Sequence, residues 1–90
     1  MLVALIALDK PGALAVRQNT RADHVAYLKS SQAVQQAGPF LDANGEMCGS
    51  LIILEVADMA QAEAWVAGDP YGAAGLFETV TLRPWNRVIG

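Results

Sequence analysis

Two short runs, one unbroken and one nearly all apolar, constrain the fold of this 90-residue chain more than any other feature. The runs Leu2–Leu8 and Ser50–Val56 contain many branched aliphatic residues and no proline, which is typical of strands buried on both faces. Breaker residues at Asp9–Gly12 end the first run. The sequence therefore predicts two central strands in a sheet that needs an apolar cover on each face.

Two segments dominated by helix-forming residues predict helices, 13–31 and 58–67. The pair Asn19–Thr20 is a weak point in the first segment, which is either one helix or a turn followed by a helix. Asp58 is the expected N-cap of the second helix. A short turn or helical segment is expected over 69–75, because it opens with Asp-Pro and ends with glycine.

Two further strands are predicted, a poorer one at 33–42 and an alternating one at 77–83. The first contains Pro39, and we expect Pro84 to end the second. Proline cannot donate a hydrogen bond to a sheet ladder, so both strands are expected at the edges of the sheet. The turn residues at 43–46 separate the first of them from the run that follows.

The predicted order of elements is β-α-β-β-α-β within a single domain, residues 1–90. With the proline-free strands in the centre, the antiparallel sheet has the order 4-1-3-2 of a ferredoxin-like α+β sandwich, with both helices on one face. The other face would then expose more apolar surface than a monomer normally carries. We therefore expect a homodimer in which two copies pack through the open sheet face.

Composition and charge exclude several classes of protein. A hydrophobic content of 53% excludes disorder, and a net charge of −3 has the wrong sign for a nucleic-acid binder. No window approaches the ~20 apolar residues of a membrane span. One cysteine and one histidine exclude an internal disulfide and the usual zinc sites, so we expect no metal and no cofactor. The start of the chain lacks the basic residues of a signal peptide, so we expect a cytoplasmic protein.

His24 is the candidate general acid or base, because histidine gains and loses a proton most readily near neutral pH. Arg17, Arg21 and His24 follow one another at helical spacing. If 13–31 is one helix, two guanidinium groups and an imidazole lie on one stripe, where they could hold a small anionic molecule beside a proton-transfer group. The alternative is a solvated helix face with a half-buried histidine.

Asp69 is the best acidic partner for His24, and it precedes Pro70 in a standard helix start. Capping and pairing are compatible if one carboxylate oxygen caps and the other points at His24. Tyr71 could line a pocket or serve packing alone. The Ser50 hydroxyl could bind a ligand or simply begin a strand, and no Gly-x-Ser-x-Gly elbow supports it as a nucleophile.

These residues belong to a series of short motifs that resembles the YciI-like (YCII-related) family almost end to end. The motifs in order are Arg17-x3-Arg21-x2-His24-Val25-Ala26-Tyr27-Leu28, Ala37-Gly38-Pro39, Gly49-Ser50, Asp69-Pro70-Tyr71, Gly75-Leu76-Phe77 and Arg83-Pro84-Trp85. Each is weak alone, and together they are specific. The resemblance implies a dimeric α+β barrel built from ferredoxin-like protomers. It also implies a pocket with a His–Asp pair, carried here onto His24 and Asp69.

The expected function is a cofactor-independent enzyme of lyase or isomerase type that acts on a small anionic or phenolic metabolite. His24 would move the proton, Asp69 would orient it, and Arg17 or Arg21 would hold the anion. The family is similar to muconolactone isomerases, and one branch includes a dehydrochlorinase of chlorinated hydroxyquinones. A non-catalytic binding or accessory module using the same pocket is the alternative. A haem-handling protein or cofactor-free oxygenase is a third possibility that rests on fold analogy alone.

Overall fold

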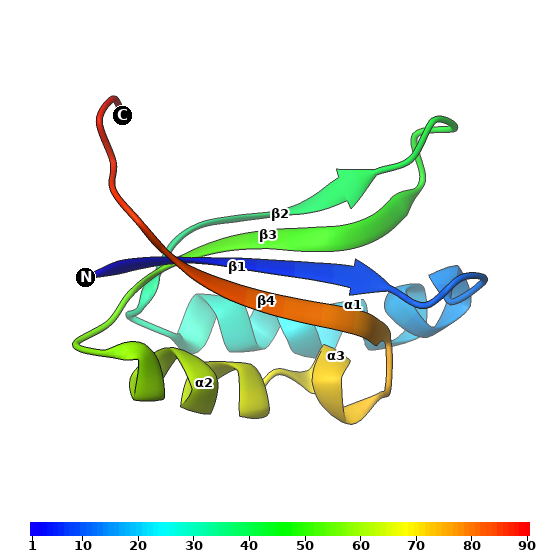
Figure 1. The fold of residues 1–90 in the computed structure, drawn as a ribbon. Coiled ribbons are helices and arrows are strands. Elements are labelled where there is room, and N and C mark those ends of the chain that lie inside the picture. The colour runs from blue at the N-terminus through cyan, green and yellow to red at the C-terminus, as the bar shows by residue number, and fades with distance from the viewer.

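The computed structural model describes residues 1–90 as a four-stranded antiparallel sheet with three helices on one of its faces (Figure 1). The strands are β1 (Leu2–Asp9), β2 (Val34–Leu41), β3 (Met47–Glu55) and β4 (Phe77–Trp85). The helices are α1 (Leu14–Ser30), α2 (Met59–Ala67) and α3 (Pro70–Ala73). The strand order β2-β3-β1-β4 is the predicted 4-1-3-2 order read from the other edge, which confirms the ferredoxin-like fold.

The two apolar runs form the central strands, and their register decides which side chains face the helices. β1 pairs with β3 from Leu2 opposite Glu55 to Leu8 opposite Gly49. The core under the helices is built mainly from alternate residues of these strands and from α2: Val3, Leu5, Ala7, Ile52, Leu54, Val56, Ala62 and Trp65. Ser50 pairs with Ala7, so its side chain lies on this helix-covered face rather than on the open one.

Helix α1 is continuous, so Asn19 and Thr20 do not interrupt it. Its buried side chains are Arg17 and His24, seven residues and therefore about two turns apart on one face. An amphipathic helix normally turns an apolar stripe to its sheet. Here a polar stripe is turned inward, which requires the sheet and the neighbouring helices to supply hydrogen-bond partners.

Aspartates begin the two shorter helices. Asp58 caps α2 as predicted, because its side chain accepts the backbone N–H of Gln61. Asp69 caps α3 by accepting the backbone N–H of Tyr71, with Pro70 in the first helical turn. The second cap fixes Asp69 over the middle of α1, with which α3 is in contact.

Two predicted strand limits are wrong. Pro84 does not end β4, which continues to Trp85 with Pro84 opposite Val3. This is possible because β4 is an edge strand, where the missing N–H of proline is not needed by a neighbour. β3 begins at Met47, before Ser50, because the preceding turn is tightened by Asp42, whose side chain accepts the backbone N–H groups of two turn residues.

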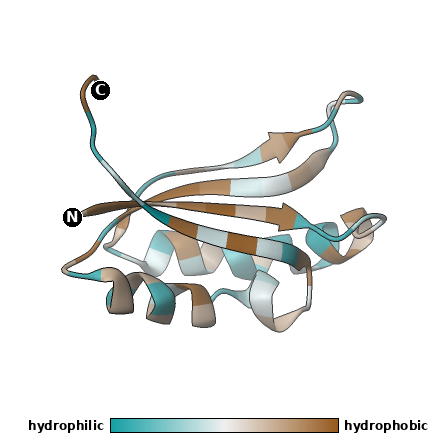
Figure 2. Ribbon diagram, viewed as in Figure 1, coloured by the Kyte–Doolittle hydropathy of each residue, from teal (hydrophilic) through white to brown (hydrophobic).

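The opposite face of the sheet carries no helix (Figure 1). Apolar residues run along β1 and β3 (Figure 2). Some of their outward side chains are accessible in the single chain, while Ala4 and Ile53 are buried among their neighbours. Leu8 and Leu51 are 47% and 38% exposed on this face, and Trp85 at the end of β4 is 41% exposed. None of the helices has the length and hydropathy that a membrane crossing requires.

Candidate active site

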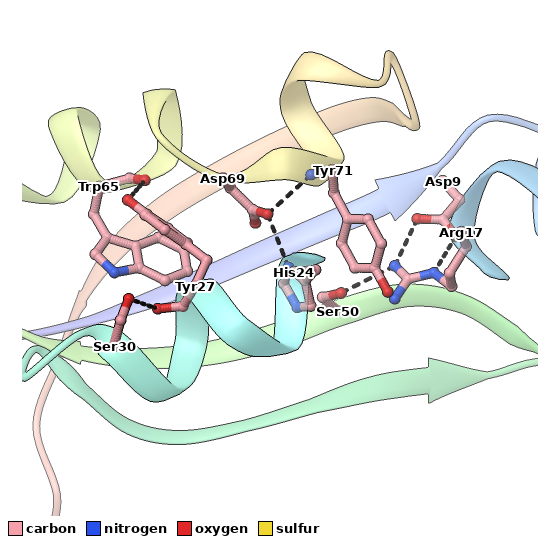
Figure 3. A network of polar contacts seen from close by, with 9 residues as sticks. All are labelled: Asp9, Arg17, His24, Tyr27, Ser30, Ser50, Trp65, Asp69 and Tyr71. Carbon is pink, nitrogen blue, oxygen red and sulfur yellow. Dashed lines mark hydrogen bonds and ion pairs between the residues drawn. The ribbon is translucent and has the colours of Figure 1, made fainter. Parts of the chain in front are cut away.

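A pocket of about 170 Å³ opens between α1, α3, β2 and β3. Five of the six side chains singled out from the sequence line it: Arg17, Arg21, His24, Ser50 and Tyr71. The sixth, Asp69, does not line the pocket but is hydrogen-bonded to His24, as Figure 3 shows. The fold therefore brings all six predicted residues together from α1, β3 and the start of α3, which are distant in sequence.

His24 and Asp69 form a buried pair in which Nδ1 of the imidazole lies 2.8 Å from Oδ1 of the carboxylate. The two residues are 6% and 1% exposed. The same Oδ1 also accepts the Tyr71 backbone N–H at 3.0 Å. Capping and pairing therefore coexist on one carboxylate oxygen, where we expected one oxygen for each.

The other ring nitrogen of His24, Nε2, makes no hydrogen bond within the chain. Every buried side-chain nitrogen and oxygen has a partner, so this nitrogen must be open to the pocket that His24 lines. A carboxylate at Nδ1 favours the tautomer with its proton on Nδ1. The lone pair of the neutral ring then lies on Nε2, where it can accept a proton from a bound molecule.

Arg17 is the second buried base of α1, and its partner is Asp9 at the end of β1. Nε and Nη2 of Arg17 donate to the two oxygens of Asp9 at 2.7 and 2.8 Å, and Nη2 also donates to Oγ of Ser50 at 2.9 Å. Burial by itself lowers the pKa of Arg17, but the hydrogen bond and the charge of Asp9 outweigh burial and raise that pKa. The Arg17 charge is thus matched inside the protein.

Asp9 was expected only to end the first run together with the breaker residues that follow it, and its side chain has a further role. β1 extends through Asp9 with a shift in register after Leu8, and the Asp9 side chain is only 6% exposed. The loop at Pro11 and Gly12 then returns the chain into α1, which brings Arg17 back to Asp9. An acidic residue before a tight strand-to-helix turn with an arginine in the following helix is the signal that sequence reasoning missed.

Tyr71 separates the two pairs, as Figure 3 shows. Its ring stacks on the imidazole of His24 with centroids 3.8 Å apart at 17°, and Cζ of Arg17 lies 4.6 Å from the same ring centroid. Burial raises the pKa of the Tyr71 phenol, and the nearby charge of Arg17 only partly opposes this. The phenol is therefore a neutral hydroxyl at physiological pH, and its ring holds the plane of His24.

Arg21 differs from Arg17 in that no side chain of the protein pairs with it. It is exposed and lines the pocket one helical turn after Arg17. Its guanidinium is therefore a free cation at the pocket, available to an anionic group of a ligand. No group of three or more histidine, cysteine, aspartate or glutamate side chains gathers anywhere in the fold.

The rest of the lining is apolar, and sequence reasoning assigned none of it to a pocket. Val25 and Leu28 come from α1, Pro39 from β2, and Met47 and Ile52 from β3. These side chains surround the polar groups with low-dielectric walls, which strengthens hydrogen bonds formed inside the pocket. A flat apolar molecule with polar substituents matches this mixture.

Relatives with similar sequences span the whole chain. The family described as YCII-related domain matches residues 1–86. Protein YciI of Escherichia coli O6:H1 is 34% identical over 97 residues, covering 98% of this chain and 99% of that protein. An uncharacterised protein of Haemophilus influenzae is 32% identical with the same coverage.

Solved structures show the same arrangement of elements. The 5-chloro-2-hydroxyhydroquinone dehydrochlorinase from Burkholderia phenoliruptrix, in complex with 2,5-dihydroxybenzoquinone, superposes with a TM-score of 0.90 at 34% identity. The match covers 96% of this chain and 94% of the dehydrochlorinase. An antibiotic biosynthesis monooxygenase has a TM-score of 0.58 at 18% identity, covering 97% of this chain and all of its own, and this similarity concerns the fold alone.

Proposed function

This chain belongs to the YCII-related domain family, and from that premise we propose that it is a cofactor-independent acid–base enzyme of lyase or isomerase type. Its substrate is a small anionic or phenolic molecule. The observation that carries the proposal is the state of His24: Nδ1 is held by Asp69, and Nε2 is free at the pocket. A histidine buried only for packing would have no reason to present an unpaired nitrogen to a cavity.

In this reaction, Nε2 of His24 accepts a proton from a carbon or hydroxyl of the substrate. The Asp69 carboxylate stabilises the imidazolium that forms, and the stacked Tyr71 ring keeps Nε2 directed at the substrate. In a lyase step, the electron pair of the broken C–H bond forms a double bond while the leaving group departs with its own pair. In an isomerase step, His24 returns the proton to another atom of the same molecule.

The size of the pocket supports a substrate with one ring. A cavity of about 150 Å³ holds one benzene molecule, and this pocket measures about 170 Å³. The similar dehydrochlorinase acts on a chlorinated hydroxyhydroquinone, which is a phenol with one ring. Arg21 is the free cation that would receive a phenolate or carboxylate of such a molecule.

The experiment is turnover of 5-chloro-2-hydroxyhydroquinone, followed by chloride release, in the native protein and in His24→Ala. We expect release by the native protein and none above the uncatalysed rate in His24→Ala, with circular dichroism verifying that the variant is folded. Equal rates in the two proteins would refute the acid–base role of His24. If single-ring phenols bind tightly and leave unchanged after long incubation, the pocket belongs to a binding module instead.

We propose in addition that two copies pair through the open sheet face. A hollow of about 380 Å³ on that face, lined by Ala4, Ile6, Leu51, Ile53 and Trp85 among others, supports this because apolar hollows of that kind are normally filled. Sedimentation equilibrium should give twice the mass of the chain, and Ile6→Glu should give a monomer. A monomeric native protein at micromolar concentration would contradict the pairing.

A further inference from the structure

The Ser50 hydroxyl has a hydrogen without an acceptor. Ser50 is 2% exposed, and its Oγ accepts a hydrogen bond of 2.9 Å from Nη2 of Arg17. A guanidinium only donates, so this contact uses a lone pair of the serine and leaves the serine O–H free. No acceptor in the chain takes that hydrogen, while Ser50 lines the pocket. A hydroxyl hydrogen without an acceptor in the protein, on a residue that lines a pocket, points to an acceptor supplied by a ligand.

The Tyr71 hydroxyl is in the same situation. Tyr71 is 1% exposed, lines the same pocket, and its O–H has no acceptor in the chain. Its hydroxyl end lies beside the Arg17 guanidinium and the Ser50 oxygen (Figure 3). Arg17 cannot accept a hydrogen bond, so the phenol too keeps its hydrogen for another partner.

We propose that Ser50 and Tyr71 form a pair of hydrogen-bond donors that binds an anionic oxygen of the ligand, and that Arg17 positions this pair instead of binding the ligand itself. The inference rests on the proposed function, because the pair and His24 share one pocket. Asp9 and Ser50 together take Nε and both hydrogens of Nη2 of Arg17, so the edge of the guanidinium beside Ser50 has no donor left for a ligand and acts through the serine. The adjacent positive charge polarises both hydroxyls and strengthens them as donors.

The donor pair defines the ligand more narrowly than charge alone. A phenolate, enolate or ionised quinone oxygen has the lone pairs to accept both hydrogens, whereas an ammonium group has none. When His24 removes a proton from the substrate, negative charge moves onto such an oxygen. Donors already oriented toward that oxygen stabilise the charge without reorganisation. Proton removal and charge stabilisation are thus served by different residues of one pocket.

The test measures the affinity of 2,5-dihydroxybenzoquinone, which carries acidic ring hydroxyls, by isothermal titration calorimetry. We expect Ser50→Ala to weaken binding at least about tenfold, and Tyr71→Phe to do the same while keeping the stacked ring. Ser30→Ala and Tyr27→Phe are the matched controls, since these hydroxyls donate to Tyr27 O and Trp65 O outside the pocket. Both controls should bind like the native protein.

A double-mutant cycle separates positioning from simple structural support. If Arg17 acts through Ser50, Arg17→Lys weakens binding in the native background and weakens it less in Ser50→Ala, where only its effect through Tyr71 remains. Ser50→Thr, which keeps the hydroxyl, should bind within about threefold of the native protein, and Tyr71→Phe carries the test if Ser50→Ala does not fold. Native affinity in both Ser50→Ala and Tyr71→Phe overturns the donor pair, while chloride release in His24→Ala still decides the proposed function. No binding of the quinone by the native protein also overturns it.

Discussion

The two buried acid–base pairs of α1 each join a basic side chain to an aspartate, but they differ in how completely the base is hydrogen-bonded to its carboxylate. Arg17 and Asp9 join through two hydrogen bonds, and a third ties Arg17 to Ser50. His24 and Asp69 join through one, and the far nitrogen of the ring has no partner in the protein. We call the first pair closed because one guanidinium binds both oxygens of its carboxylate, and the second open because one nitrogen of its ring has no partner, although they lie about two turns apart on the same helix. The way each base engages its carboxylate, rather than burial, separates the two pairs.

The difference follows from the geometry of the two bases. Guanidinium has five N–H donors in a planar fork that matches both oxygens of a carboxylate at once. Imidazole has two nitrogens on opposite sides of a ring, so a carboxylate at one side always leaves the other available. Exchanging the two bases between these positions would therefore exchange the open site and the closed one.

The largest effect is expected from breaking the closed pair. Asp9→Ala leaves the Arg17 charge buried without a partner and should lower the free energy of unfolding by about 3–5 kcal/mol in urea titrations. The double variant Asp9→Leu with Arg17→Met, which removes both charges, should recover much of that loss. If Asp9→Ala is as stable as the native protein, the pair does not hold β1 to α1.

A smaller effect, confined to activity, is expected from the open pair. Asp69→Asn retains a good helix cap, so its urea midpoint should stay close to that of the native protein. Chloride release from the hydroxyhydroquinone should fall at least about 100-fold, because an amide cannot stabilise the imidazolium. In ¹⁵N NMR, the single His24 ring should lose its preference for the proton on Nδ1.

Asp58→Asn is the matched control, because it makes the same change in the N-cap of α2, away from the pocket. Its activity and its histidine spectrum should match those of the native protein. Equal losses of activity in the two asparagine variants would assign the effect to capping and not to the charge beside His24.

Arg21 offers a comparison with the two buried pairs, because this exposed arginine of α1 has no partner inside the protein. Arg21→Gln should weaken binding of 2,5-dihydroxybenzoquinone about three- to tenfold with unchanged stability, and should reduce the dependence of that binding on salt. Arg87→Gln, which removes an exposed charge near the C-terminus, controls for net charge. Equal effects from both variants would indicate long-range attraction instead of contact at the pocket.

The smallest effect concerns Tyr71, the ring between the two pairs. Burial raises its pKa above the ordinary value of 10.0. The folded protein therefore holds the phenolic proton more firmly than the unfolded chain. The resulting stability is present below about pH 10 and is lost as the pH rises through the folded pKa. The urea midpoint of the native protein should be lower at pH 10.5 than at pH 8. The decrease between these two pH values should be smaller in Tyr71→Phe. An equal fall would place the alkaline loss elsewhere.

Much of this site was accessible from the sequence because helical spacing decides which side chains share a face. Arg17, Arg21 and His24 were placed together on that basis, and the Asp-Pro start placed Asp69 at a helix end. Spacing does not decide which partner lies across from each side chain. The difference between Arg17 and Arg21 depends on how the loop after β1 returns Asp9 to α1, which is tertiary geometry.

The same distinction explains the fold. The proline-free runs predicted the central strands correctly, since their burial follows from composition. The ends of β3 and β4 were misjudged because they depend on neighbours. Pro84 is tolerated only because β4 has a free edge, and β3 starts early only because Asp42 tightens the turn before it.

The inward polar stripe of α1 has a consequence for how this chain can diverge. Its two buried side chains are also the ones proposed to position the donor pair (Arg17) and to move the proton (His24). Folding and activity are therefore selected at the same positions. If a well-packed apolar pair replaced either the Arg17–Asp9 pair or the His24–Asp69 pair, α1 would be more stable and the pocket inactive. Descendants that have lost the reaction should therefore be recognisable by leucine or methionine at positions 17 and 24. Retention of both bases in a distant copy would indicate that the chemistry is still in use.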